Sequence, residues 1–416
     1  MATVPAGGFN ATFSLGSAEA GSVAANVLGA LNAALATGIL TRADAPSTPP
    51  ASGQGLAFVT APGNYVAAQQ NTALIVGAGA GAVGILGSSA TGNMILVDTA
   101  VGTPAAPFVY NTNGGSGTLV TGDGTAVIGT GTAPSTASFR IQTGAGNDTI
   151  LAFSGNNTIA AGGGSNVIGT GAAGTTSNNL VFAAGNDTIS GGGGKGSDIV
   201  IAGGGTTYVT PGNKNLTFIG TTGAATIIGG TGQEYVALGA GGGQAGGGSA
   251  GPNALFGGTG SAGSTLFGGA NGDVLFARGP GSTVLVAGAG NETLQGGGST
   301  GNNTFITGSG GAVIGSGSGN DVFSVAGTGN ATINGGAGQD IYQFAYRPSG
   351  SATTVIVNNF KASTDKILLS SFAQRPGGAA VTFSPANGGS LAVLADGTKI
   401  TFVGAVVTLN AVVTLP

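Results

Sequence analysis

The sequence of 416 residues contains no cysteine, no histidine and no tryptophan. Disulfide bonds are therefore absent, and neither thiol nor imidazole chemistry can operate. The usual zinc and copper sites depend on the same side chains, so they are excluded as well. Any catalytic site would have to be built from carboxylates with Arg or Lys nearby.

Charged residues are also scarce, with ten Lys and Arg against 14 Asp and Glu and a net charge of −4. The basic residues form no patch, so we expect no nucleic-acid partner. The suggestive neighbours for catalysis are Glu234 beside Tyr235 and Asp273 near Arg278. So few cations, without histidine, leave little from which to build an active site, and we expect a protein that is not an enzyme.

Glycine is abundant, at 88 positions, yet 41 % of the residues are apolar. Glycine without a strict triplet period excludes collagen. The apolar content and the low net charge oppose disorder. Stacked glycine turns between short apolar strands are the remaining explanation.

A repeat of nine residues extends from Gly144 to Phe344. Asp148, Asn157 and Asn166 are nine residues apart, and each ends a glycine turn and precedes a short apolar strand. A unit this short cannot bury its apolar residue alone, so successive units must stack.

The period predicts the fold. Two nine-residue units form one flattened coil of roughly 18 residues, and coils stack about 4.8 Å apart through backbone hydrogen bonds. The fold class is therefore all-β, a parallel β-roll or β-helix solenoid. We expect these apolar strand residues to point inward: Ile150, Ile159, Ile168, Ile189, Val200, Leu275, Leu294, Phe305, Ile314, Phe323, Ile333 and Tyr342.

Most acidic residues fall at or near the turn position of this repeat, whereas a solvated surface would scatter them. Eight of the 14 do so: Asp148, Asp187, Asp198, Glu234, Asp273, Glu292, Asp321 and Asp340. The asparagines of the Asn-x-Thr triplets also recur in the turns, at Asn147, Asn156, Asn186, Asn291, Asn302 and Asn330. We expect these asparagines to form hydrogen-bonded ladders along the stack.

Three phrases carry a family resemblance: Gly144-Ala-Gly-Asn-Asp148-Thr-Ile150, Gly193-Gly-Lys-Gly-Ser-Asp198-Ile-Val200 and Gly335-Gly-Ala-Gly-Gln-Asp340-Ile-Tyr342. They resemble the Gly-Gly-x-Gly-x-Asp-x-apolar-x repeat of the RTX (repeats-in-toxin, haemolysin-type calcium-binding) β-roll family, in degenerate form. The units ending at Asp198 and Asp340 match it fully.

The resemblance implies Ca²⁺ held between aspartates of alternate units and glycine-turn carbonyls on one edge of the roll. Carboxylates about 18 residues apart meet this requirement at Asp321 and Asp340, and less well at Asp273 and Glu292. Elsewhere the partner is missing, because Asp148 faces Asn166, Asp198 faces Asn179, and Asp187 falls on the other edge. We expect a mostly metal-independent roll with one to three weak sites toward its C-terminal end. The predicted metal ligands are Asp321, Asp340, Gly319, Gly338, Asp273, Glu292 and Asp198.

Residues 1–55 are predicted to form an N-terminal helical segment and a Pro-rich linker. Ser17 to Ile39 is typical of a helix with Ser17 as N-cap, and we expect it to cover an edge of the stack. A signal or membrane helix is an alternative, which three glycines and two asparagines disfavour. Residues 56–143 indicate irregular β coils or a small β domain. In the RTX-like repeats at 144–345, we expect Gly239 to Gly251 to be a protruding loop.

Residues 346–416 are predicted to form a C-terminal β cap. Val357-Asn-Asn-Phe360, Asp365-Lys-Ile-Leu and the Asp-Gly-Thr hairpin near the end resemble the closing module of RTX proteins. In that family the C-terminal segment is the signal for type I secretion, so the resemblance implies an extracellular or cell-surface location. Alternatively, this module merely seals the roll.

The sequence therefore favours a non-enzymatic extracellular structural protein whose solenoid self-assembles into a filament or surface layer. Its main partner would be a second copy of itself, and we expect no membrane span. The alternative is a calcium-dependent adhesin or ligand-binding module for sugar or ice, with a cell-surface polysaccharide as partner.

Overall fold

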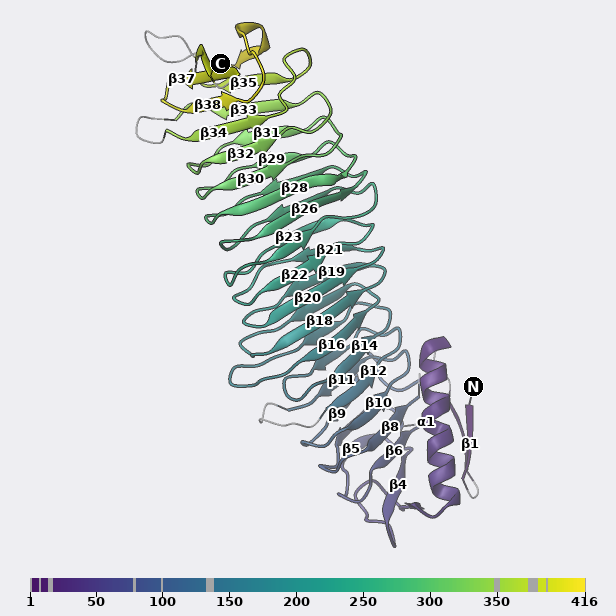
Figure 1. Cartoon of the computed structure of the whole chain (residues 1–416). Helices are drawn as coiled ribbons and strands as arrows, with labels where there is room; N and C mark the ends of the chain where they lie inside the picture. The colour runs from purple at the N-terminus through teal and green to yellow at the C-terminus, as the bar shows by residue number, and fades with distance from the viewer. Residues whose placement is uncertain are drawn as a thin grey trace. The chain divides into compact units, whose positions relative to one another are not determined.

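The computed structural model describes residues 2–415 apart from 7–8, 14–17, 78–79, 99, 132–137, 348–351, 373–380 and 387. The described residues fall into two compact units, Met1–Thr217 and Phe218–Pro416. Each unit is built from successive parallel strands that alternate between two sheets, as Figure 1 shows. The predicted fold class, a parallel β-solenoid with a short N-terminal helix, is confirmed.

The first unit carries eight or more strands in each of its two sheets. The first sheet contains β3 (Leu40–Arg42), β4 (Gln54–Val59), β6 (Ala73–Val76), β8 (Asn93–Val97), β10 (Gly117–Val120), β12 (Phe139–Gln142), β14 (Thr158–Ala161), β16 (Asn179–Ala183) and β18 (Ser197–Ala202). The second sheet contains β5 (Gly63–Val66), β7 (Val83–Leu86), β9 (Phe108–Asn111), β11 (Ala126–Gly129), β13 (Thr149–Leu151), β15 (Val167–Gly169), β17 (Asp187–Ser190) and β19 (Thr206–Thr210). Strand β20 (Asn215–Gly220) contains the division between the units. The strands from β4 to β12 pair in parallel like the later ones, so residues 56–143 continue the same coils.

The second unit has the same architecture. Its first sheet contains β22 (Glu234–Ala237), β24 (Ala254–Phe256), β26 (Val274–Gly279), β28 (Glu292–Ser299), β30 (Ala312–Gly315), β32 (Ala331–Asn334), β34 (Thr354–Asn358) and β38 (Lys399–Phe402). Its second sheet contains β21 (Ala224–Ile227), β23 (Gly243–Gly246), β25 (Ser264–Phe267), β27 (Thr283–Val286), β29 (Thr304–Ile306), β31 (Val322–Val325), β33 (Ile341–Ala345), β35 (Lys366–Ser370) and β39 (Val412–Leu415). Strands β36 (Val381–Ala386) and β37 (Gly389–Leu394) join β38 in an antiparallel meander, and a short 3-10 turn, Leu409–Ala411, precedes β39.

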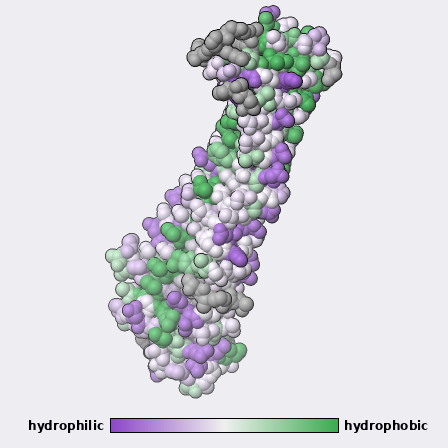
Figure 2. All heavy atoms as spheres, turned by 90° about the vertical axis from the view of Figure 1, so that its left-hand side faces the viewer, coloured by the Kyte–Doolittle hydropathy of each residue, from purple (hydrophilic) through white to green (hydrophobic). Residues whose placement is uncertain are grey.

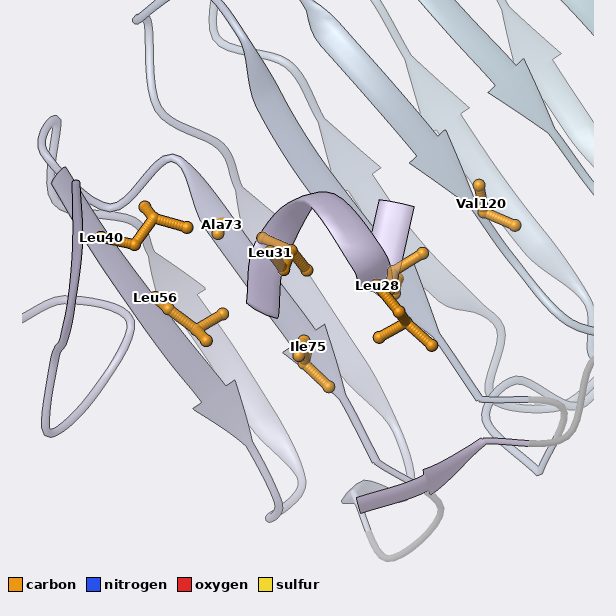
Figure 3. Packing of buried hydrophobic residues seen from close by; sticks show 8 residues of the cluster. Leu28, Leu31, Leu40, Leu56, Ala73, Ile75 and Val120 are labelled. Atoms are coloured by element: carbon orange, nitrogen blue, oxygen red, sulfur yellow. The ribbon is translucent and has the colours of Figure 1, made fainter. Parts of the chain in front are cut away.

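Helix α1 (Ala18–Ala36) belongs to the first unit and contacts β1 (Ala2–Ala6), which pairs with β2 (Phe9–Phe13) in a hairpin that the sequence did not predict. Its Leu28 and Leu31 are buried against the outward side chains of β3, β4, β6, β8 and β10. Figure 3 shows both leucines pointing from the helix toward these strands. The helix therefore lies across the outer face of the first sheet, and the prediction that it covers an edge of the stack was wrong. The predicted N-cap, Ser17, lies outside the described residues. In the part of the chain that the structure describes, no helix is long and apolar enough to cross a membrane.

The core is a thin layer between the two sheets. All twelve apolar residues that the period places inward are at most 1 % exposed, which confirms the inside–outside pattern. Aromatic rings stack coil upon coil in the second unit: the centroids of Phe305 and Phe323 are 5.3 Å apart, and those of Phe323 and Tyr342 are 4.9 Å apart.

The segment Gly239 to Gly251, predicted as a loop, contains strand β23. Its Ala245 is fully buried and lies in register with Ile227 and Leu266. The loop prediction was wrong because the pairing partners on both sides supply order that Gly, Ala and Gln lack as individual β-formers.

Candidate metal centre

Each unit contains columns of polar side chains at the points where a turn enters a strand. We call these residues the inner columns. In each, a buried Asn or Asp side-chain oxygen accepts a hydrogen bond from the backbone N–H of the equivalent residue in the preceding coil. The columns are Asn157, Asn179 and Asp198, and Asp148, Asn166 and Asp187, in the first unit, and Asn253 and Asp273, and Asn303, Asp321, Asp340 and Asp365, in the second.

Exposed asparagines in the same turns form what we call the outer columns. Their side-chain oxygens accept hydrogen bonds from the following coil, whereas those of the inner columns accept from the preceding coil. The Oδ1 atom of Asn147 accepts from the N–H of Ser165, and that of Asn302 accepts from the N–H of Asn320, each in the following coil. Asn156, Asn186, Asn291 and Asn330 make equivalent contacts. The six asparagines are hydrogen bonded from coil to coil as predicted, but through backbone N–H groups of the following coil; Asn156 also accepts from the side-chain amide of Asn178. Every such coil is thus bonded through side chains to the coils before and after it.

Asp321 and Asp340 lie at the same position of successive coils, as predicted. The Oδ1 atom of Asp321 accepts the N–H of Asn303 at 2.7 Å, and that of Asp340 accepts the N–H of Asp321 at 2.9 Å. The Oδ2 atoms of both aspartates are buried and have no hydrogen-bond partner among the described residues. Burial raises the pKa of Asp321, and it raises that of Asp340 to about 7, with Asp365 and Asp321 adding repulsion.

The predicted glycine ligands line the same turns. Gly338 has a φ of +121°, and a Cβ there would lie 2.1 Å from the carbonyl oxygen of Gly319. A Cβ at Gly319 would in turn lie 2.2 Å from the carbonyl oxygen of Gly301. Only glycine allows the turns to approach this closely. The main-chain carbonyls of Gly301 and Gly319 therefore lie against the turns that precede Asp321 and Asp340.

Asp273 immediately precedes β26 and Glu292 begins β28, an adjacent strand of the same sheet, but the surroundings of the two side chains differ. Asp273 accepts four hydrogen bonds, from both the N–H and the side-chain amide of Asn253 and from the N–H groups of Gly269 and Ala270. No oxygen of Asp273 is left for a metal. Both carboxylate oxygens of Glu292 are buried without a hydrogen-bond partner in the part of the chain that the structure describes, and burial raises the pKa of Glu292 to about 7.

Asp198, in the phrase that matches the repeat fully, is occupied as well. Its Oδ1 atom lies 2.6 Å from the Nζ of Lys214 and accepts the N–H of Asn179, while its Oδ2 accepts the hydroxyl of Thr170. A Ca²⁺ ion at Asp198 would have to displace the ammonium group. The sequence did not point to Lys214, although a lone lysine in a turn 16 residues after Asp198 is close to the coil period.

Asp148, Glu234 and Asp365 also lie where a turn enters a strand. Asp148 and Glu234 each accept a backbone N–H with one carboxylate oxygen, and the other oxygen is buried with no hydrogen-bond partner in the described ranges. Burial raises the pKa of Asp148 to about 6 and that of Glu234 to about 7. Asp365, which the sequence did not single out, accepts from Asp340, Thr364 and Lys361.

These oxygens fit a hard cation at some turns and not at others. Unpartnered buried carboxylate oxygens are costly, and a bound Ca²⁺ would satisfy those of Asp321 and Asp340. Among the described residues, no three acidic side chains gather closely enough to hold a metal by themselves. A bound ion would therefore need main-chain carbonyls of the glycine turns to reach the about six to eight oxygens that Ca²⁺ prefers.

Two stacked parallel sheets, glycine corners and turn aspartates define a parallel β-solenoid of the β-roll type. Residues 140–168 match the family model described as the RTX calcium-binding nonapeptide repeat (4 copies), which confirms the resemblance. Repeats of this family typify secreted proteins. No curated protein and no solved structure matches the chain.

Proposed function

We propose that this chain is an extracellular, non-enzymatic structural protein whose coils self-assemble through their outer sheet faces. The RTX-type solenoid supports an extracellular calcium-binding structural or adhesin-like role. The proposal of assembly rests mainly on the chemistry of the outer faces.

The outer face of the second sheet in the second unit is uncharged over four successive strands. Outward residues there are Thr265 and Phe267, Val284 and Val286, Thr304 and Ile306, and Val322 and Ser324. Phe267 remains 43 % exposed. Figure 2 shows hydrophobic, near-neutral and hydrophilic side chains mixed over the side of the molecule that it draws. The uncharged face formed by these four strands neither repels a second copy nor hydrates strongly, which favours contact between copies.

Bound calcium would stabilise the coils that take part in assembly. At Asp321 and Asp340 an ion would neutralise two buried carboxylates and stabilise the coils that carry the outer face. In the RTX family the C-terminal segment carries a type I secretion signal, and we propose the same route for residues 346–416.

Assembly is tested on the purified full-length chain by light scattering and electron microscopy. A Val284→Lys/Val322→Lys variant places two charges on the outer face and is expected to remain dispersed where the unaltered chain forms particles or layers. Ser52→Lys/Gln70→Lys adds the same charge at exposed turn positions and should assemble normally. A full-length chain that is strictly monomeric at high concentration, with and without Ca²⁺, would refute the proposal.

A second candidate, a calcium-dependent adhesin, is favoured by a groove of about 450 Å³ in the second unit. It is lined by polar residues that include Asn291, Thr293, Asn330, Thr332 and Thr354, together with Val313 and Ile356. Amide and hydroxyl groups beside apolar carbons suit a sugar chain. Retention on immobilised polysaccharide that a Thr332→Lys variant loses, without any change in assembly, would favour this candidate.

A further inference from the structure

Lys214 places its ammonium group in the interior of the first unit. The side chain is fully buried, and Nζ donates to three oxygens of different kinds: the carboxylate Oδ1 of Asp198 at 2.6 Å, the carbonyl oxygen of Thr170 at 2.9 Å and the hydroxyl of Ser177 at 3.1 Å. All three donor protons of the ammonium thereby have a partner. The three oxygens therefore form a buried cation-binding site that the lysine ammonium occupies.

The Lys214 stem runs beside two glycines whose nearest neighbours are main-chain carbonyls of adjacent turns. A Cβ at Gly171 would lie 3.4 Å from the Cδ of Lys214, and one at Gly191 would lie 3.3 Å from it. The stem therefore passes close to two glycines, and its charged end reaches oxygens from the turns of earlier coils. Carboxylate, carbonyl and hydroxyl oxygens are also the ligands that a hard metal cation takes.

Comparison with the other inner columns indicates what the lysine supplies. Among the residues that the structure describes, no lysine forms an ion pair with Asp148, Asp321 or Asp340, and one carboxylate oxygen of each is buried without a hydrogen-bond partner. At Asp198 both oxygens are hydrogen bonded. The Thr170 hydroxyl satisfies Oδ2 of Asp198, and the Lys214 ammonium adds an ion pair to Oδ1, which also accepts the N–H of Asn179. What the lysine supplies is therefore a positive charge beside a buried carboxylate.

We propose that the Lys214 ammonium is a tethered replacement for a bound metal cation at the Asp198 turn. The Asp198 turn then needs no calcium. Truncation of the Lys214 side chain, which removes the ammonium, converts the same oxygens into a vacant cation site. The inference does not depend on self-assembly. It divides the chain into turns that are independent of calcium and turns that respond to it.

The test is hydrogen–deuterium exchange of the full-length chain, read in peptides that cover residues 165–216, in chelator and in millimolar Ca²⁺. In the unaltered chain, protection in these peptides is expected to be the same under both conditions. In Lys214→Ala, protection in chelator should fall by about 100-fold or more, the usual result of leaving a buried charge unpaired, and Ca²⁺ should restore much of it.

Two variants separate this proposal from an ordinary buried ion pair. Lys214→Met fills the space of the stem without charge, so its lost protection should not return with Ca²⁺. Lys195→Ala removes an exposed lysine of the same region and should leave protection unchanged. Failure of Ca²⁺ to restore Lys214→Ala would overturn the proposal, and so would a calcium-induced gain of protection at residues 165–216 in the unaltered chain. The measurement on the unaltered chain tests the proposal even where the variants do not fold.

Discussion

The backbone N–H of Asp321 donates to the Oδ1 atom of Asp340 over 2.9 Å, so each aspartate is held by the next coil of the stack. The Oδ2 atom of Asp340 is buried and, among the residues described by the structure, has no hydrogen-bond partner. The same carboxylate is thus both a structural acceptor and an unsatisfied group. This double character governs how the second unit should respond to pH and calcium.

Asp340 is expected to make stability fall as pH rises in the presence of chelator. Its pKa is raised from 3.8 to about 7, so between these values the folded chain keeps a proton that the unfolded chain releases. The stabilising contribution is complete below pH 4 and is lost as pH rises through 7, with an upper limit of about 4 kcal/mol. Asp340→Asn should lack this contribution, which thermal unfolding of both chains from pH 4 to 8 will measure.

Calcium should reduce that difference, because the ion binds the ionised carboxylate. Asp44→Asn, an identical change at an exposed position of the first unit, should follow the unaltered chain at every pH. Parallel pH profiles for Asp340→Asn and the unaltered chain would contradict the prediction.

Asn253 should be far more important for stability than an outer asparagine. Its Oδ1 atom accepts the N–H of Glu234, and its amide donates to Gly248 and Asp273, all in buried surroundings. Asn253→Ala leaves several buried groups unpaired, and we expect it to destabilise the second unit by about 2–4 kcal/mol. Asn291→Ala removes an exposed bond to Gly311 and should cost less than about 1 kcal/mol. Urea unfolding of each variant tests this, and equal costs would show that burial of the columns is unimportant.

Phe323 is the central ring of a three-ring stack and is fully buried. Phe323→Ala should destabilise by about 3–5 kcal/mol because it leaves a cavity that the neighbouring coils cannot close. Phe323→Leu keeps most of the volume and should cost less than about 2 kcal/mol. Phe267→Ala, at an outward position, is the matched control in the same unfolding measurement. A cost for Phe267→Ala as large as that for Phe323→Ala would argue against a core between the sheets.

Gly327 tests how closely the turns are stacked. A Cβ there would lie 1.5 Å from the carbonyl oxygen of Gly308, a contact that backbone cannot relieve without moving the coil. Gly327→Ala is therefore expected to cost about 3 kcal/mol or more. Gly297→Ala meets nothing within 4 Å and should be nearly neutral. Circular dichroism melting curves distinguish the two, and a neutral Gly327→Ala would mean that the turns are further apart.

The fold could be predicted from the sequence wherever its determinants are local. The nine-residue period predicts that Ile150 and Phe323 point inward without knowledge of the strands with which they pair, and both residues are buried. The strand at Gly243–Gly246 could not be foreseen, because its order comes from β21 and β25 on either side. The apolar stripe of α1 indicates that the helix packs, but not against which surface.

The site was predictable to a similar degree. Spacing alone placed Asp321 and Asp340 in adjacent coils. It could not reveal that Asp273 accepts four hydrogen bonds, since these depend on turn geometry at Gly269 and Ala270. Nor could it reveal Lys214, whose contacts reach back 44 residues to Thr170.

The opposed directions of the inner and outer columns make a whole coil an interchangeable module. Every such coil presents one acceptor to its predecessor and another to its successor, and the equivalent position recurs after 18 residues from Asn302 to Asn320 and after 19 from Asn320 to Gln339. A gene duplication or deletion of that length would bring equivalent inner-column and outer-column residues into contact again. A change of nine residues would instead place strands of one sheet against strands of the other. Such a chain can lengthen or shorten in evolution in steps of one coil while its cross-section stays the same.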